Sequence, residues 1–201
     1  MYKRQSLGGP PGGLLLASDA ELAQRLEAIA YPGLTANFDA GKTAALAQTM
    51  LDWTIAGPDY AAAMVDTARS LADQLLEAGL PVFRRTHGVT GSHQFALEAA
   101  SLGGGQAASA RLRRGNLLAS GIGLPIPPVG GDLNGLRLGT PEIARLGMTP
   151  ADMPELASFI TRALTGTPED VAGDVAAWRT QFDQVWFTTD HPTLPQRANA
   201  A

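Results

Sequence analysis

The stretch NGLRLGTPE, residues 134–142, places a single arginine between two leucines in a segment with the apolar alternation of a β-strand. A guanidinium among aliphatic side chains is costly to bury unless an anion pairs with it. The planar fork of donors on Arg137 suits a carboxylate best. That carboxylate can come from the chain itself, as Glu98 or Glu142, or from a ligand. The residues alone leave both alternatives open.

The composition describes a folded chain and excludes several classes of function. Of the 201 residues, 45% are apolar and 17% are charged, and the net charge is -4. This balance gives no general attraction to nucleic acid or to an anionic membrane. Zero cysteines exclude disulfides and thiolate chemistry. No apolar run approaches the length of a membrane helix and no leader is visible, so we expect a cytoplasmic protein.

Capping residues predict three helices in the first part of the chain. The capping-box spacing from Ser18 predicts a short amphipathic helix with Leu22, Leu26 and Ile29 on one face. Asp39 can cap a second helix that runs to about Thr54, and Asp59 can cap a third. Gly79 and the proline that follows it are expected to end the third helix.

After residue 81 the apolar pattern changes to that of a small α+β layer. Strands are predicted at 92–98, at 117–124 and around 136–138, with a helix over 106–116.

The last part of the chain is predicted to be helical again, with Met153, Phe159 and Ile160 on the buried face of the first helix there. Thr149 and Thr167 each begin the same start signal, a hydroxyl cap followed by proline and an acidic first turn. The tail from Asp190 is predicted to be frayed.

Other sequence patterns give weaker indications of a functional site. The three histidines, His87, His93 and His191, are too widely separated to form a metal-ligand pattern, so no metal site is predicted. His93 on an alternating strand is more typical of a packed structural residue than of a catalyst. The turn over residues 8–13, GGPPGG, is rigid and poor in side chains. Such a backbone can approach a phosphate or a cofactor closely.

Several segments together resemble one enzyme family. NGLRLGTPEIARLG, residues 134–147, resembles the S-G-I-R-x-G-T-P-A-x-x-x-R-G stretch of serine hydroxymethyltransferases. SLGGPPGGLLLAS, from residue 6, resembles their T-L-R-G-P-R-G-G-L-I-L run. AIAYPGLTAN resembles their F-P-G-x-Q-G-G, and SHQFALEA falls where they have D-N-H-L-x-L-V-D. The resemblance covers residues 6–164 in order and corresponds to the second part of such an enzyme.

The resemblance implies an α/β fold. It implies the end of the large domain of a fold type I pyridoxal-phosphate (PLP) enzyme, followed by the α+β carboxy-terminal small domain. We therefore expect a remnant of the PLP-binding domain over 1–56, the small domain over 57–188 and a flexible tail over 189–201. The upstream cofactor domain is expected to be missing, and the opening residues suggest a truncated or frameshifted reading frame.

Site residues carry over position by position. In the family, the Schiff-base lysine that holds PLP immediately precedes the glycine turn, and Gln5 stands at that place. Lys3 lies two residues earlier and is a weak candidate. Gly9, Gly12 and Gly13 match the turn itself. Arg137 matches the arginine that binds the α-carboxylate of the substrate.

Two other positions depart from the family pattern. Asn37 lies where the family has the backbone that contacts the cofactor phosphate across the dimer, and it can still donate a hydrogen bond. The asparagine on the folate side of the family site aligns near Ile122, which has no amide. This puts dependence on tetrahydrofolate in doubt.

Two functional hypotheses follow. In the first, the chain is the carboxy-terminal part of a PLP-dependent enzyme that acts on a small amino acid by hydroxymethyl transfer, aldol cleavage or β-elimination. The complete enzyme is then expected to be a homodimer, without nucleic-acid or membrane partners. In the second, the chain is a non-catalytic remnant or an interaction module that folds or dimerises without cofactor.

Overall fold

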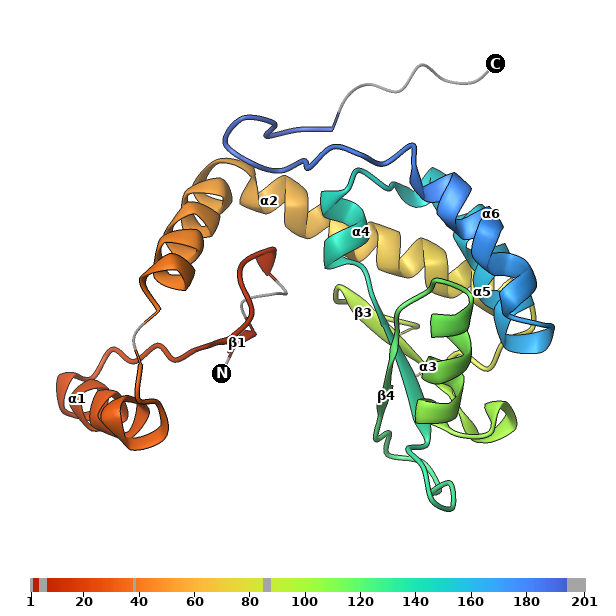
Figure 1. Cartoon of the computed structure of the whole chain (residues 1–201), viewed down its shortest axis with the longest axis horizontal. Coiled ribbons are helices and arrows are strands. Elements are labelled where there is room, and N and C mark those ends of the chain that lie inside the picture. The colour runs from red at the N-terminus through yellow and green to blue at the C-terminus, as the bar shows by residue number, and fades with distance from the viewer. Residues whose placement is uncertain (1, 4–6, 38, 85–87, 195–201) are drawn as a thin grey trace.

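The fold is an α/β arrangement organised along one long helix. A computed structural model describes residues 2–3, 7–37, 39–84 and 88–194. In Figure 1 the long helix α2 connects an N-terminal segment at one end to a sheet with packed helices at the other. The elements in chain order are β1 (Tyr2–Lys3), β2 (Gly13–Leu14), α1 (Ala20–Ala28), the π-helical segment η2 (Ile29–Leu34), α2 (Ala40–Glu77), β3 (Gln94–Glu98), the 3-10 turn η3 (Ala100–Leu102), α3 (Gly105–Arg114), β4 (Ser120–Ile122), β5 (Gly135–Gly139), α4 (Pro141–Arg145), the 3-10 turn η4 (Pro150–Asp152), α5 (Met153–Thr165) and α6 (Glu169–Arg179).

Helix α2 is continuous where the sequence predicted two helices. Asp39 caps it as expected, because its carboxylate accepts from the Lys42 amide at 2.9 Å. The predicted break before Asp59 is wrong, since α2 runs through Pro58 to Glu77. Proline removes one backbone hydrogen bond from a helix, but packing of an apolar face can outweigh that loss.

The second half of α2 supplies that apolar face. Its inward side chains recur at helical spacing and are at most 5% exposed: Tyr60, Met64, Ala68, Leu71 and Leu75. They belong to two adjoining clusters of the core. The helix therefore ends in the core, and Gly79 with a positive φ of 80° closes it, as predicted.

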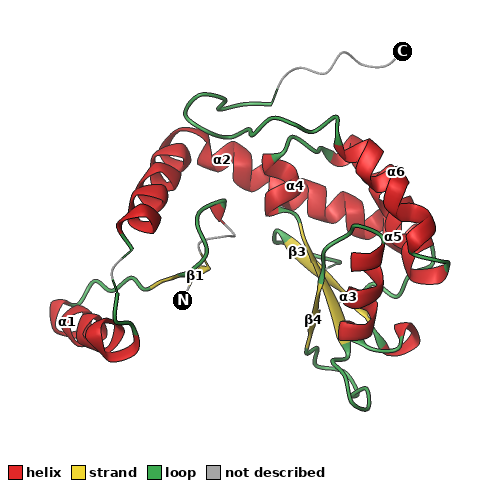
Figure 2. Ribbon diagram, in the orientation of Figure 1, coloured by secondary structure: helices red, strands yellow, loops and turns green. Residues whose placement is uncertain are grey.

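The sheet has three antiparallel strands in the order β3-β5-β4, with β5 in the centre. The predicted strand over 117–124 is shorter in the structure, where β4 covers only Ser120–Ile122. Leu136 and Leu138 of β5 are buried and face the core, and they alternate with the half-buried Arg137. Figure 2 shows this small sheet among the helices that make up most of the fold.

Helix α5 packs against α2, and α6 packs against α5. The predicted buried positions of α5 are confirmed, with Met153, Phe159 and Ile160 at most 3% exposed. Thr149 forms a capping box with Asp152 in the 3-10 turn η4 that leads into α5. For α6 the predicted hydroxyl cap is wrong, because Pro168 occupies the N-cap position and makes no side-chain cap bond.

Helix α3 receives its N-terminal cap from a distant loop. The Asp132 carboxylate accepts from the amides of Gln106 and Ala107 at 2.9 and 3.0 Å. These backbone hydrogen bonds lower the pKa of Asp132. The same loop leads directly into β5, so the cap also fixes where the central strand begins.

Helix α1 and the segment around it contribute little to the core. Its N-cap is Asp19, one residue after the predicted Ser18, and the Asp19 carboxylate accepts from the Leu22 amide at 2.6 Å. None of its residues is buried. Leu22 and Ile29, predicted to form a shared apolar face, are 46% and 55% exposed.

The C-terminal segment runs back along α2 and is ordered further than predicted. Thr189, at the start of the predicted tail, donates its amide to Asp52 of α2 at 3.0 Å. Phe187 is 3% exposed and stacks on Tyr60 with ring centroids 5.2 Å apart. The remainder of the predicted tail, residues 195–201, lies outside the described residues.

Within the described part of the chain, no helix is long and apolar enough to cross a membrane.

A substitution in α2 tests the packing of the Trp53 ring over Gly57, one turn further along the helix. A methyl group at Gly57 would lie 2.7 Å from the Trp53 ring, so Gly57→Ala should destabilise the fold by about 1–3 kcal/mol. Gly173→Ala in α6 is the matched control, because a methyl group there meets open space. The control should stabilise the fold by about 0.5–1 kcal/mol through helix propensity. Urea unfolding measures both, and equal effects would contradict the packing.

The Asp132 cap predicts a pH dependence of stability. A carboxyl whose pKa is lowered by folding stabilises the fold above its unfolded pKa, and this contribution is lost as the pH falls through its folded pKa. Asp132→Asn should therefore lower the urea midpoint at pH 7. The difference from the parent should shrink between about pH 5 and pH 3. Asp59→Asn, at an exposed position on α2, serves as the control. A gap that stays constant with pH would contradict the cap.

Candidate functional site

The predicted substrate arginine lies in the middle of the central strand. Arg137 is paired across the sheet with Ala96 of β3 and Ser120 of β4. Both neighbouring leucines point into the core, so the Arg137 side chain leaves the sheet on the opposite face. That face is not the one against which α3 and α5 pack.

Arg137 has no carboxylate partner among the described residues. The ion pairs of these residues involve other side chains, and neither Glu98 nor Glu142 pairs with Arg137. Glu98 ends β3 opposite Gly135, and Glu142 is exposed in α4. A half-buried guanidinium therefore remains available to an outside anion.

His93 directly precedes β3 and lies near the charge of Arg137. Partial burial lowers the pKa of His93, and the positive charge of Arg137 lowers it further. Its backbone carbonyl accepts from the Thr140 amide at 3.0 Å and from the Thr140 hydroxyl at 3.1 Å. The same hydroxyl donates to the Met64 carbonyl of α2 at 2.6 Å. The backbone of His93 thus belongs to the junction of β3, α2 and the start of α4, while a structural role for its side chain stays a prediction.

The glycine turn lies beside the first half of α2. Its backbone uses left-handed conformations at Gly8 and Gly12, with φ of 75° and 146°, which favour glycine. The indole nitrogen of Trp53 donates to the Leu7 carbonyl at 2.8 Å. Gly9 lies within the turn, and Gly13 begins β2, which pairs with β1.

The position expected for the cofactor lysine is only partly visible. Gln5 lies outside the described residues. Lys3 forms the end of β1 and pairs through its backbone with Gly13. Asn37 is exposed in the loop between η2 and α2. The structure does not bring Asn37 and Arg137 together in a described contact.

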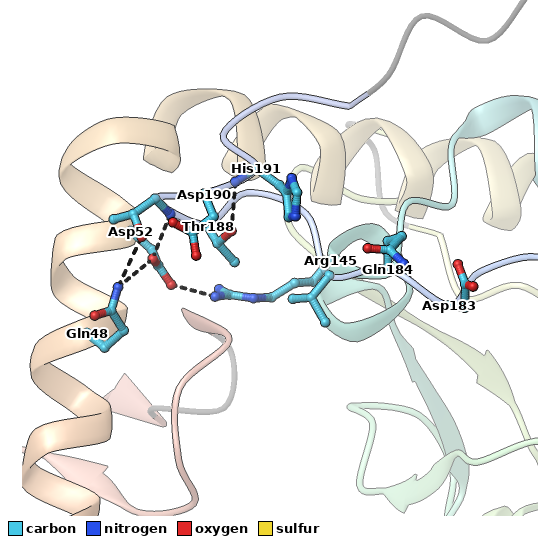
Figure 3. A pocket seen from close by; sticks show the side chains of 10 residues that line it. Gln48, Asp52, Arg145, Asp183, Gln184, Thr188, Asp190 and His191 are labelled. Atoms are coloured by element: carbon cyan, nitrogen blue, oxygen red, sulfur yellow. Dashed lines mark hydrogen bonds and ion pairs between the residues drawn. The ribbon is translucent and has the colours of Figure 1, made fainter.

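A buried ion pair that the sequence did not reveal joins α2 to α4. The carboxylate of Asp52 accepts from Arg145 at 2.6 Å, and the side chains are only 4% and 14% exposed. Figure 3 shows this pair in an open groove of about 720 Å³ beside the C-terminal segment. Gln48 and the Thr189 amide donate to the same carboxylate, at 3.1 and 3.0 Å.

Two signals could have pointed to this pair. Asp52 interrupts the apolar face of a predicted helix, and Arg145 lies one residue before Leu146, where the quoted family stretch has its second arginine. Each is an ordinary surface residue when considered alone. Only the path of the unbroken α2 brings them together.

His191 borders the groove, and its ring lies 5.4 Å from that of Trp186. Among the described residues, no group of three or more histidine, aspartate or glutamate side chains could hold a metal ion. His87 lies outside the described residues.

Comparison with known proteins gives one consistent family. The chain is 62% identical over 183 residues to an alpha-methylserine aldolase of Variovorax paradoxus, and 54% identical over 185 residues to one of a Ralstonia species. It is 34% identical over 180 residues to the serine hydroxymethyltransferase of Pyrobaculum arsenaticum. These alignments cover 91%, 91% and 89% of the chain, and 42% of each relative. No protein-family model matches the chain.

A solved structure agrees with the sequence relatives. The fold superposes on the crystal structure of an L-threonine transaldolase from Pseudomonas fluorescens with a TM-score of 0.75 and 25% identity. The superposition covers 92% of this chain and 43% of that one. The α/β fold is thus that of the carboxy-terminal part of a fold type I enzyme. The chain matches the carboxy-terminal part of the serine hydroxymethyltransferase-like family, to which these aldolases and the transaldolase are related.

The described residues do not by themselves make a complete PLP site. The sequence contains two lysines, Lys3 and Lys42. Lys42 is exposed and pairs with Asp39 at 3.4 Å, away from the glycine turn in sequence. The glycine turn offers a backbone that a cofactor could approach, but no described side chain beside it can bind PLP covalently.

Proposed function

We propose that this chain supplies the carboxy-terminal part of a PLP-dependent enzyme of serine hydroxymethyltransferase type that cleaves a small β-hydroxy amino acid. The observation that carries the proposal is Arg137, a half-buried guanidinium with no carboxylate partner among the described residues. A fork of donors in that setting fits the α-carboxylate of an amino acid.

Among the possible reactions we favour aldol cleavage, with α-methylserine as the first substrate to test. The relatives that are 54–62% identical carry the name alpha-methylserine aldolase. In such a reaction the Cα–Cβ bond breaks, the hydroxyl loses its proton, and the hydroxymethyl carbon leaves as formaldehyde. The α-carbon then gains a proton, and alanine remains. Hydroxymethyl transfer and β-elimination are the alternatives.

When bound, PLP would withdraw electrons from the α-carbon. The part of this chain would be to bind and orient the substrate. Arg137 would fix the carboxylate on the open face of the sheet, and this sets which bond at the α-carbon is presented for cleavage. Ile122 of β4 stands where the family has its folate-side amide, so we propose that the reaction does not need tetrahydrofolate.

The missing partners of the site would be an upstream PLP domain and, in the complete enzyme, a second subunit. Large apolar side chains in the N-terminal region and the first half of α2 support such docking, because each is at least 46% exposed: Leu15, Leu16, Leu22, Ile29, Tyr31, Leu34, Leu51 and Ile55. We propose that residues 1–56 belong with that upstream domain, 57–188 with the small domain and 189–201 with the tail, α2 crossing the first boundary.

The first test uses the chain alone. Incubation with PLP followed by borohydride reduction should give no stoichiometric adduct at Lys3 or Lys42, because no complete site surrounds either lysine. Peptide mapping by mass spectrometry locates any adduct. A one-to-one adduct at Lys3 that competes with free amino acid would contradict the proposal, since the chain would then bind cofactor without a further domain.

The second test asks whether Arg137 binds the substrate. The corresponding part of the Variovorax paradoxus aldolase is replaced by this chain from Leu7 onward, so that the relative supplies everything before the glycine turn. The chimera should cleave α-methylserine. Arg137→Ala should then lower kcat/KM, and the corresponding loss of transition-state stabilisation should be about 2–3 kcal/mol, the value of a charge-assisted pair.

Arg113→Ala is the matched control for this test, because it removes the same charge from an exposed position on α3. It should leave kcat/KM unchanged. Unchanged kinetics for Arg137→Ala in an active chimera would assign Arg137 to a structural role.

A further inference from the structure

The Asp52 carboxylate is fully engaged by groups from three parts of the chain. It accepts from Arg145 of α4 at 2.6 Å, from the Thr189 amide of the C-terminal segment at 3.0 Å and from Gln48 of its own helix at 3.1 Å. Four-per-cent exposure of its side chain makes the charge costly without these donors. Asp52 therefore holds the guanidinium of Arg145 in one orientation (Figure 3).

That orientation presents the other guanidinium nitrogen to the glycine turn. Nη1 of Arg145 is buried and has no hydrogen-bond partner among the described residues. A methyl group added at Gly8 would collide with the same nitrogen. The backbone of Gly8 therefore lies directly against the guanidinium, in a conformation and at a distance that only glycine allows.

A second contact acts on the neighbouring residue of the turn. The Trp53 indole donates to the Leu7 carbonyl at 2.8 Å. Trp53 follows Asp52 on α2. Asp52 therefore acts on Gly8 through Arg145, and Trp53 acts directly on Leu7, the residue before the turn.

Tyr60, seven residues after Trp53 and thus about two turns further along α2, contacts both Trp53 and Arg145. Its ring centroid lies 5.6 Å from that of Trp53, and the guanidinium carbon of Arg145 lies 5.7 Å from it. Burial raises the pKa of Tyr60 to about 12, so its hydroxyl stays protonated and donates to the Pro141 carbonyl at 2.7 Å.

We propose that Arg145 is a positioning residue: its pair with Asp52, together with Trp53, clamps the glycine turn against α2 and α4. This inference rests on the proposed function, because the family resemblance places the cofactor lysine immediately before this turn. The clamp would fix that position relative to the strand that carries Arg137. Arg145 itself touches neither substrate nor cofactor in this proposal.

The experiment measures the turn in the chain as it is, without cofactor. Exchange of the Trp53 indole proton with solvent is followed by NMR, with the backbone amides of β5 as the reference for global opening. Arg145→Lys keeps the charge but loses the fork, and should accelerate Trp53 exchange about tenfold. Gly8→Ala leaves the buried pair in place and pushes the turn away, so it should have a similar effect.

The double variant decides between positioning and simple stabilisation. If the guanidinium and Gly8 act through one contact, combining the two changes should accelerate exchange no more than either change alone. Effects that multiply would overturn the proposal. Acceleration of the β5 amides equal to that of the Trp53 indole would also overturn it, since the pair would then merely stabilise the fold.

Arg162→Lys is the matched control. It alters an exposed ion pair of similar length, 2.8 Å to Asp174, far from the turn. It should leave Trp53 exchange unchanged, and an equal acceleration would overturn the proposal. None of these measurements needs PLP or substrate. A negative result here would therefore not affect the kinetic test of Arg137, and a negative result in the kinetic test would not affect the exchange measurements.

Discussion

The unbroken course of α2 is the constraint on which the remaining structure depends. One continuous helix, whose axis bends between its two halves (Figure 1), carries Asp52 and Trp53 beside the glycine turn, and further along it carries Tyr60, Met64 and Ala68 into the core. The loss of one hydrogen bond at Pro58 is a modest cost beside the burial of the apolar face that follows it.

The buried ion pair is weak evidence for stability but good evidence for a specified geometry. Replacing such a pair by apolar residues is often neutral or stabilising, because desolvation offsets most of the attraction. A pair that only held α2 to α4 would therefore have cheaper substitutes. In our proposal Asp52 and Arg145 set a geometry that an apolar contact cannot, because the guanidinium carbon lies 5.7 Å from the centre of the Tyr60 ring while its nitrogens meet a carboxylate and the backbone of the turn.

Local sequence patterns predicted the individual helices and strands well, but they predicted the contacts and connections between them poorly. The caps at Asp39 and Thr149, the buried face of α5 and the strand around Arg137 follow from neighbouring residues and were correct. The break near Pro58 was wrong, because a proline rule is local while the packing that overrides it comes from residues far along the chain. The cap of α3 by Asp132 could not be predicted, since 25 residues separate the carboxylate from the amide it binds.

The candidate site shows the same division. The odd chemistry of an arginine between two leucines identified Arg137, and the structure leaves it without a described carboxylate on the open face of the sheet. Arg145 belongs to the same quoted stretch but gives no such signal, because an arginine ending a short polar helix is ordinary.

The two arginines differ in whether a described residue supplies a carboxylate to them. Asp52 supplies the anion for Arg145 among the described residues, and the Nη1 atom of Arg145 lies against the backbone of Gly8. Arg137 shares its sheet face with Ala96 and Ser120, which are too short and carry no charge that could neutralise it. Among the described residues, Arg145 is therefore paired with a carboxylate, while Arg137, eight residues earlier on an adjoining element, is not. Under the proposed function, Arg145 would position the turn and Arg137 would bind the substrate, with the rest of the site on another domain.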